Sequence, residues 1–297
     1  MFVVNVPIVL IAGLAAVRVV RPDRDTGAGR LDIAGIILGA LTLSSGTFAV
    51  IHLGHSGVST TTVTAALIAC LALAGFLLVE STKTDPMLPL ALFRKPAFST
   101  ANGVAGAMNL GTLGLLFLLT LFLQTVQQRS ALLAGVAVLP LFLPLSLLAP
   151  LAGRVTGRLG PKPMMITGLA VAAAGVALLA TWDASTAYGW LLPPMLAWGA
   201  GLGLLTPAVV AAAIAATPAT RSGLASGVNN TARQAGGVIG VAAYGAIAGP
   251  PNDTKHFVAG LHTAGLINAG LFVAAAVATA ILIPSRQRVR SPDLPPR

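Results

Sequence analysis

Residues 163–182 read PMMITGLAVAAAGVALLATW, a run without Asp, Glu, Lys or Arg between Lys162 and Asp183. About 20 apolar residues in a helix span the roughly 30 Å hydrocarbon core of a bilayer, where a helix satisfies its own backbone polar groups. Similar charge-free runs recur at residues 33–79, 97–128, 184–220 and 256–285. The sequence therefore predicts an all-α, polytopic membrane protein.

The overall composition supports this class. Hydrophobic residues make up 56% of the chain and charged residues 9%, whereas charged residues approach about a quarter of an ordinary globular domain. A net charge of +10 would suggest a nucleic-acid partner for a soluble protein. Here membrane orientation accounts for the basic residues, so we expect no nucleic-acid binding and a lipid bilayer as the surroundings.

Polar, Gly and Pro clusters divide the apolar runs into nine candidate transmembrane helices. They lie at about 2–20, 33–53, 61–79, 98–126, 131–152, 163–181, 189–214, 224–248 and 262–284. Of the 18 Lys and Arg, 15 fall in the odd-numbered connections and the C-terminal tail, and only Arg129 and Lys255 fall in the even-numbered ones. This bias predicts a plasma-membrane protein with an outside N-terminus and a cytoplasmic C-terminus. Nothing ahead of Met1 would direct its translocation, which favours a truncated protein.

Several segments resemble the fourteen-span drug:proton antiporter branch of the major facilitator superfamily, the EmrB/QacA type. The most specific is SGLASGVNNTARQAGGVIGVA at 222–242, which is similar to the penultimate helix of that branch. Three others are PMLPLALFRKPAFSTAN at 86–102, PLAGRVTGRLGPKPMM at 150–165 and FVVNVPI at 2–8. The resemblance covers about the last nine of the fourteen spans.

This resemblance implies four parts. Residues 1–32 would be the last helix of a missing N-terminal bundle and a cytoplasmic loop, and residues 33–97 two linker helices and a second loop. Residues 98–284 would be the C-terminal six-helix bundle and residues 285–297 a cytoplasmic tail. In the family, substrate is held between two bundles, and the proton-linked carboxylates lie largely in the first. All Asp and Glu of this chain fall in loops, in the tail or at helix ends, so we expect no buried carboxylate.

Arg233 lies inside the predicted 224–248 helix, with Asn230 and Gln234 nearby. An ionisable group at membrane depth usually faces a bundle interior or a water-filled cavity. The alternative is that its long side chain reaches back to the headgroups. Asn230 and Gln234 are four residues apart and share a helix face, which makes all three candidates for a substrate cavity.

Four further residues are candidates for the same cavity. Asn102 and Asn109 are seven residues apart on the predicted 98–126 helix and would offer hydrogen bonds in an apolar wall. Contacts between helices explain them equally well. Met195 and Trp198 on the 189–214 helix would add adaptable and aromatic surface, but core packing is the favoured interpretation for both.

Glycines and basic residues form two other patterns. Two pairs of glycines have a spacing of four residues within each pair: Gly223 and Gly227, and Gly236 and Gly240. This spacing predicts close helix packing rather than a hinge. A basic-glycine cytoplasmic loop is expected at 153–162 with the motif residues Gly153, Arg154, Arg158, Gly160 and Lys162. In the family an acidic residue usually precedes the second arginine, and here that position is Gly157.

Other classes of site find little support. His52, His55, His256 and His262 all fall near the predicted outer face, but no Cys or carboxylate completes a metal ligand set. The glycine runs lie inside apolar spans rather than after a strand, so no nucleotide site is expected. No span holds a Ser/His, paired-Asp or metal constellation. We therefore expect no enzyme, no metal and no cofactor.

These observations predict a transporter. By resemblance, it would export hydrophobic or cationic drugs and metabolites in exchange for protons and confer multidrug resistance. The alternative is a non-transporting membrane remnant, or a half-transporter subunit that needs a separate N-terminal bundle.

Overall fold

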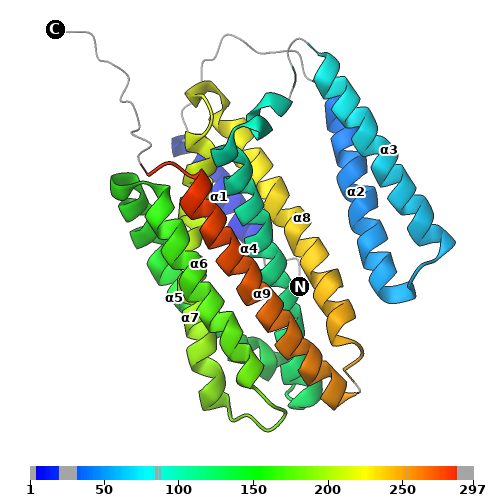
Figure 1. The fold of residues 1–297 in the computed structure, drawn as a ribbon, viewed down its shortest axis with the longest axis vertical. Helices are drawn as coiled ribbons and strands as arrows, with labels where there is room; N and C mark the ends of the chain where they lie inside the picture. Colours follow the sequence, from blue (N-terminus) through cyan, green and yellow to red (C-terminus); the bar gives the residue numbers. More distant parts are fainter. Residues whose placement is uncertain (1–4, 20–31, 84–85, 87, 252, 286–297) are drawn as a thin grey trace. The chain divides into compact units, whose positions relative to one another are not determined.

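A computed structural model describes residues 5–19, 32–83, 86, 88–251 and 253–285. The described residues form α-helices joined by short turns, without strands, as the sequence predicts (Figure 1). The helices are α1 (Asn5–Val19), α2 (Ile33–Ser56), α3 (Thr60–Thr82), α4 (Pro96–Leu121), α5 (Ala131–Leu159), α6 (Pro161–Ala177), α7 (Tyr188–Ala215), α8 (Ser222–Ala248) and α9 (Thr254–Leu282). Helix α1 belongs to a unit of its own, residues 1–33, and the other helices form a second unit.

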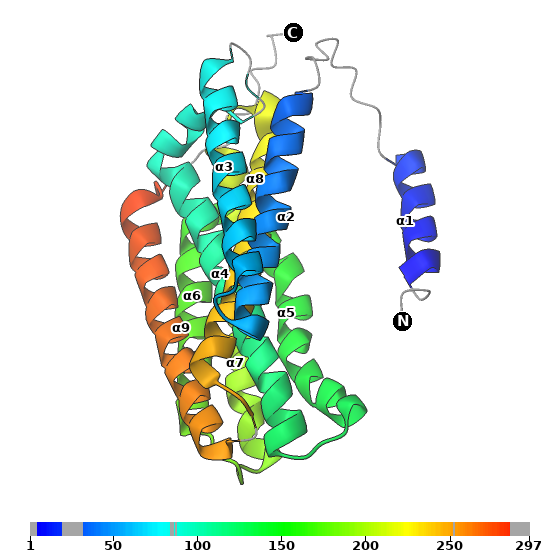
Figure 2. The same ribbon diagram turned by 90° about the vertical axis from the view of Figure 1, so that its right-hand side faces the viewer.

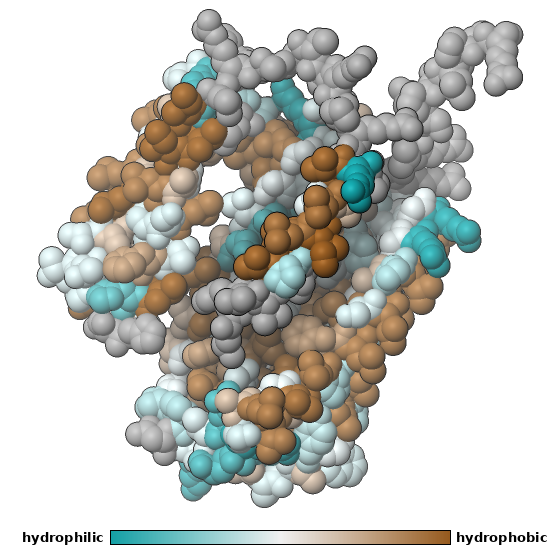
Figure 3. All heavy atoms as spheres, turned by 180° about the vertical axis from the view of Figure 1, so that it is seen from behind, coloured by the Kyte–Doolittle hydropathy of each residue, from teal (hydrophilic) through white to brown (hydrophobic). Residues whose placement is uncertain are grey.

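Seven helices among the described residues are long and apolar enough to cross a membrane, namely α2 to α7 and α9. Helix α8 is 27 residues long but is the least apolar of the long helices, because it carries Asn229, Asn230, Arg233 and Gln234. Brown apolar side chains cover broad parts of the face shown in Figure 3, as expected for helices that face lipid.

Local signals set the helix ends. Ser59 and Ser130 are N-caps whose hydroxyl groups accept hydrogen bonds from the backbone N–H groups of Thr62 and Leu133, at 3.2 Å and 3.3 Å. Asp253 caps α9 in the same way, with the N–H of His256 at 3.1 Å. Helices α4 and α6 instead begin with proline, which suits a first turn because its missing N–H would lack a partner there.

Helices α4 to α9 pack into a bundle of six, and Figure 2 shows α4 beside α8. The main contacts pair α4 with α8, α7 with α5 and α6, and α9 with α6 and α4. Glycines make these contacts close: a Cβ added at Gly236 or Gly240 would collide with the backbone of Gly106 or Leu110 of α4. Close backbone approach of this kind stabilises helices in a bilayer through van der Waals contact.

Two expected packing glycines behave differently. A Cβ added at Gly223 or Gly227 would meet no atom within 4 Å. In the described residues, Gly236 and Gly240 thus lie against α4, whereas Gly223 and Gly227 have open space beside them. Both of these glycines are exposed, because the contact between α4 and α8 follows another face of the helix there.

The predicted loop at 153–162 is largely helical. Helix α5 continues through Gly153, Arg154 and Arg158 to Leu159, seven residues beyond the predicted end of the span. Arg is a good helix former, so leaving the hydrocarbon does not end the helix. The turn is Gly160, whose φ of 84° lies in the region that favours glycine, and Lys162 is already in α6. Helix α9 similarly begins at Thr254, eight residues before the predicted start.

Helices α2 and α3 form an antiparallel hairpin held by small residues. Gly39 lies against the Phe76 ring, Gly75 against Leu38, and Gly46 against the methyl group of Ala69, with added-Cβ distances of 3.4–3.8 Å. Only 17% of each apolar span is buried, against 50% for α4 and 56% for α7. Most of the hairpin surface is therefore free of protein contact.

The end of α3 contains a buried carboxyl group, contrary to the expectation from sequence. Glu80 is 2% exposed, and its Oε2 accepts a hydrogen bond from the backbone N–H of Leu88 at 3.0 Å. Oε1 is buried without a hydrogen-bond partner in the described structure. Glu80 does lie at a helix end as predicted, but the chain folds back over it, which the linear sequence does not reveal.

Candidate functional site

The candidate site centres on the polar first half of α8. Arg233 is half-buried, and its Nε is enclosed without a hydrogen-bond partner among the described residues. Arg233 lies 11 residues into α8, which corresponds to roughly 16 Å of rise. A charged side chain at such a depth is costly unless a partner or water compensates it. This position makes Arg233 the strongest functional candidate of the described chain.

Two buried asparagines join α4 to α8 one turn before Arg233. Asn229 Nδ2 donates to Asn102 Oδ1 at 3.3 Å, and Asn102 Nδ2 donates to the carbonyl oxygen of Phe98 at 2.9 Å. Asn229 Oδ1 is buried without a partner. Asn229 and Arg233 are four residues apart on one helix face. The acceptor Asn229 Oδ1 and the donor Arg233 Nε, both without a hydrogen-bond partner in the described residues, therefore lie one turn apart. The sequence pointed to Asn102 but not to its pairing with Asn229.

A second polar contact lies deeper in the bundle. The Tyr244 hydroxyl of α8 donates to Asn268 Oδ1 of α9 at 3.3 Å. Asn268 is fully buried, and a Cβ added at Gly111 of α4 would overlap its amide. Three helices therefore meet at this amide. Sequence reasoning missed it, because an Asn in an apolar run carries no sign of which helices lie beside it.

The other sequence candidates separate into exposed and core positions. Asn230 and Gln234 are exposed, whereas Asn109 is 9% exposed. Met195 and Trp198 are fully buried in the hydrophobic core, where they pack the bundle. Helix α7 is apolar on all its faces, and the sequence therefore gives no indication of which residues point inward.

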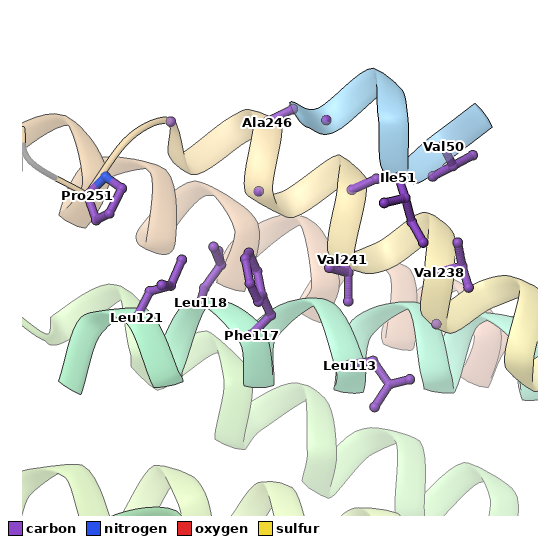
Figure 4. Close-up of a pocket in the computed structure, with 15 residues that line it drawn as sticks. Val50, Ile51, Leu113, Phe117, Leu118, Leu121, Val238, Val241, Ala246 and Pro251 are labelled. Atoms are coloured by element: carbon purple, nitrogen blue, oxygen red, sulfur yellow. The ribbon is translucent and has the colours of Figure 1, made fainter. Parts of the chain in front are cut away.

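Three cavities separate α8 and α4 from the hairpin. The first, of about 440 Å³, lies between α2, α4 and α8, and Figure 4 shows apolar side chains around it, including Ile51, Phe117 and Val241. A second cavity of about 340 Å³ places Asn230, Thr231 and Gln234 of α8 opposite Thr42 and Thr47 of α2. The third lies nearer the start of α8 and has a volume of about 520 Å³.

The basic motif residues lie apart from these cavities. Arg154 and Arg158 are exposed on the last turns of α5, and the Lys162 ammonium is 3.5 Å from the Ser285 hydroxyl. Thr156 between the two arginines is buried. The motif therefore marks the turn between two helices, at the same end of the bundle as the start of α8.

His262 and His52 make contacts with neighbouring groups. His262 bonds through a ring nitrogen to the carbonyl oxygen of Trp182, and the His52 ring stacks on Phe48 at 5.6 Å between centroids. Within the described ranges, no group of three His, Cys, Asp or Glu could hold a metal ion. In the nearby turn, hydrogen bonds from Ser185 and Thr186 hold the pKa of the exposed Asp183 carboxyl below its usual value.

Comparison with known proteins places this arrangement in a family. A sequence profile of the Major Facilitator Superfamily matches residues 1–241 and 142–296. The chain belongs to the major facilitator superfamily. It is thus a multi-pass membrane protein of a family of transporters, which agrees with the apolar helices of the described structure.

Individual superfamily members support the same assignment. The puromycin resistance protein pur8 of Streptomyces alboniger is 34% identical over 244 residues, 80% of this chain and 48% of that protein. The tetracenomycin C resistance and export protein of Streptomyces glaucescens is 32% identical over 252 residues, 83% of this chain and 46% of the relative. The multidrug transporter protein MdtP of Bacillus subtilis is 28% identical, with shares of 83% and 46%. The chain spans about half the length of these relatives.

Proposed function

We propose that the chain exports hydrophobic or cationic drugs and metabolites across the plasma membrane, and that bundle α4–α9 supplies one of the two walls of the transport path. The other wall would come from a second bundle, as the resemblance to the fourteen-span drug:proton antiporter branch implies. In this assignment, the nine helices correspond to the last nine spans of that branch, and the basic end of the bundle faces the cytoplasm.

The polar face of α8 is the observation that carries this proposal. Arg233, Asn230 and Gln234 lie on a helix as long as its apolar neighbours, and Arg233 Nε has no partner in the described chain. Polar groups at membrane depth are expensive and mark substrate or ion pathways. Relatives named for puromycin resistance, tetracenomycin C export and multidrug transport support drugs as the substrate class.

We assign proton coupling to the N-terminal bundle of the family. The bundle α4–α9 holds Asp183 and Asp253 in its described residues, and both are exposed at the ends of helices. Glu80 is buried, but it lies at the end of α3 and already accepts the Leu88 N–H. A carboxyl group that carries protons in exchange for drug must reach a water-filled path from both sides. Neither the exposed Asp183 and Asp253 nor the buried Glu80 has such access.

Deletion of the coding region in its host tests the transport proposal. Loss of residues 98–284 should raise the intracellular level of ethidium and puromycin and lower the concentration that inhibits growth. A plasmid that carries the intact locus should restore both values. Unchanged accumulation and unchanged growth inhibition in the deletion strain would contradict the proposal.

A reconstitution experiment tests the two-bundle part separately. The purified 297-residue chain, alone in liposomes with an imposed pH gradient, should leave an ethidium gradient unchanged. Co-reconstitution with the first five spans of a relative such as pur8 should restore transport that the proton ionophore CCCP abolishes. Robust proton-driven transport by the chain alone would contradict the need for a second bundle, while leaving drug export itself intact.

A further inference from the structure

The largest of the three cavities lies between the hairpin and the start of α8. It has a volume of about 520 Å³, within the range of ligand pockets. Its walls come from α2, α3, α4, α8 and the segment before α4, and they are overwhelmingly apolar. Leu43, Leu73, Phe76, Phe93, Leu224 and Val228 supply the larger side chains.

The helices around this cavity cross the membrane, so its surroundings differ from those of a cavity in a soluble protein. Helices α2, α3 and α4 are each long and apolar enough to span a bilayer. An apolar cavity does not hold water, because water needs two to four polar partners. An open apolar gap between helices in a bilayer is filled by the apolar molecules that surround it, which are acyl chains.

Basic residues neighbour the cavity wall in the chain. Arg94 and Lys95 directly follow Phe93 of the cavity wall, and Arg221 lies one helical turn before Leu224. Arg94 and Lys95 are exposed and Arg221 is half-buried. Lys95 Nζ lies 3.4 Å from the carbonyl oxygen of Ala216, which brings the start of α4 next to the turn before α8.

Glu80 is an acidic group near this part of the cavity wall. Glu80 lies behind Leu88, which also lines the cavity, and its carboxyl group is buried toward the Leu88 N–H. Because the Glu80 carboxyl group is buried, it does not share the exposed surface of Arg94 and Lys95. These basic residues attract an anion at the level where an apolar cavity opens toward the headgroups of the same leaflet.

We propose that this cavity binds an anionic phospholipid, with an acyl chain between the α2–α3 hairpin and α8 and the phosphate at Arg94, Lys95 and Arg221. The lipid takes the place of direct protein contact between the hairpin and the bundle. The site adjoins the polar face around Arg233, because Asn102 and Thr231 line this cavity, but the proposal does not depend on the transport proposal. Glycine at position 227 leaves room for the chain, since no atom lies within 4 Å of an added Cβ.

Native mass spectrometry of the full chain tests the headgroup part. The purified, delipidated protein is titrated with phosphatidylglycerol or with phosphatidylcholine. The triple variant Arg94→Gln, Lys95→Gln, Arg221→Gln should weaken phosphatidylglycerol binding about tenfold or more and change phosphatidylcholine binding less than about twofold. The matched control Arg154→Gln, Arg158→Gln, Lys162→Gln removes the same charge from the same end of the bundle and should bind phosphatidylglycerol as the unmodified chain does.

A cavity-filling variant tests the acyl-chain part of the proposal. It also keeps the proposal testable if the triple variant does not fold. Gly227→Phe should reduce binding of both lipids about tenfold, because the ring occupies the acyl-chain position, while Gly223→Phe should change neither. Equal loss in both triple variants, or unchanged lipid binding in Gly227→Phe, would overturn the proposal. Binding of inorganic phosphate as tightly as phosphatidylglycerol would also overturn it, because the acyl chain would then contribute nothing to binding.

Discussion

The bundle α4–α9 and the α2–α3 hairpin are built from similar apolar helices but are held in different ways. Half or more of the α4 and α7 spans is buried, against 17% for α2 and α3. In the bundle, glycines bring the backbones of α4 and α8 into direct contact. The hairpin faces α4 and α8 across cavities instead. Apolar composition therefore places a helix in the membrane, whereas small residues on the facing surfaces decide whether it packs on protein.

The largest effect should come from filling a close glycine contact. Gly240→Leu would force the side chain into the backbone of Leu110, so we expect a loss of about 3 kcal/mol or more in stability, with a lower melting temperature in detergent. Gly227→Leu, which enters open space, is the matched control and should melt near the unmodified protein. Equal melting temperatures for the two variants would contradict the packing difference.

A smaller effect should follow from breaking the asparagine pair between α4 and α8. Asn102→Ala leaves Asn229 Nδ2 buried without its acceptor, which should cost about 1–2 kcal/mol. The double variant Asn102→Ala, Asn229→Ala should recover part of that loss, because it removes the unfilled amide. A double-mutant cycle on denaturation in detergent gives the coupling. A coupling of zero would show that the two amides do not interact.

The smallest effect is expected at the deeper polar contact. Tyr244→Phe removes only the hydroxyl that donates to Asn268, and hydrogen bonds between membrane helices contribute about 0.6 kcal/mol on average. Thermal unfolding in the same detergent should show a correspondingly small shift. If Tyr244→Phe lowered the stability more than Asn102→Ala does, the predicted ranking of the two hydrogen-bonded contacts would be wrong.

Much of the fold can be predicted from sequence, because each charge-free run must be a helix in a bilayer. The ends are harder to place: α5 passes through Arg154 and Arg158 to Gly160, since charged residues end the hydrocarbon span but not the helix. The buried Glu80 carboxyl group accepts a hydrogen bond from Leu88, eight residues further along the chain. Such a contact between segments has no periodicity to reveal it.

The site could be predicted only in part. Arg233, Asn230 and Gln234 stand out because polar residues are rare in apolar spans. The partners of these helices could not be identified, so the Asn102–Asn229 and Tyr244–Asn268 pairs emerge only from the packing. Neighbouring helices in a bundle are set by surfaces far apart in the chain.

The central claim is that the polar face of α8 forms part of the transport path. The direct measurement is the initial rate of proton-driven ethidium export in everted vesicles that contain the assembled transporter, for Arg233→Ala, Arg233→Lys and the exposed control Arg154→Ala. We predict a loss of about tenfold or more for Arg233→Ala at unchanged membrane level, partial activity for Arg233→Lys, and full activity for Arg154→Ala. Export by Arg233→Ala at the unmodified rate would contradict the claim, because Arg233 would then only reach toward the headgroups.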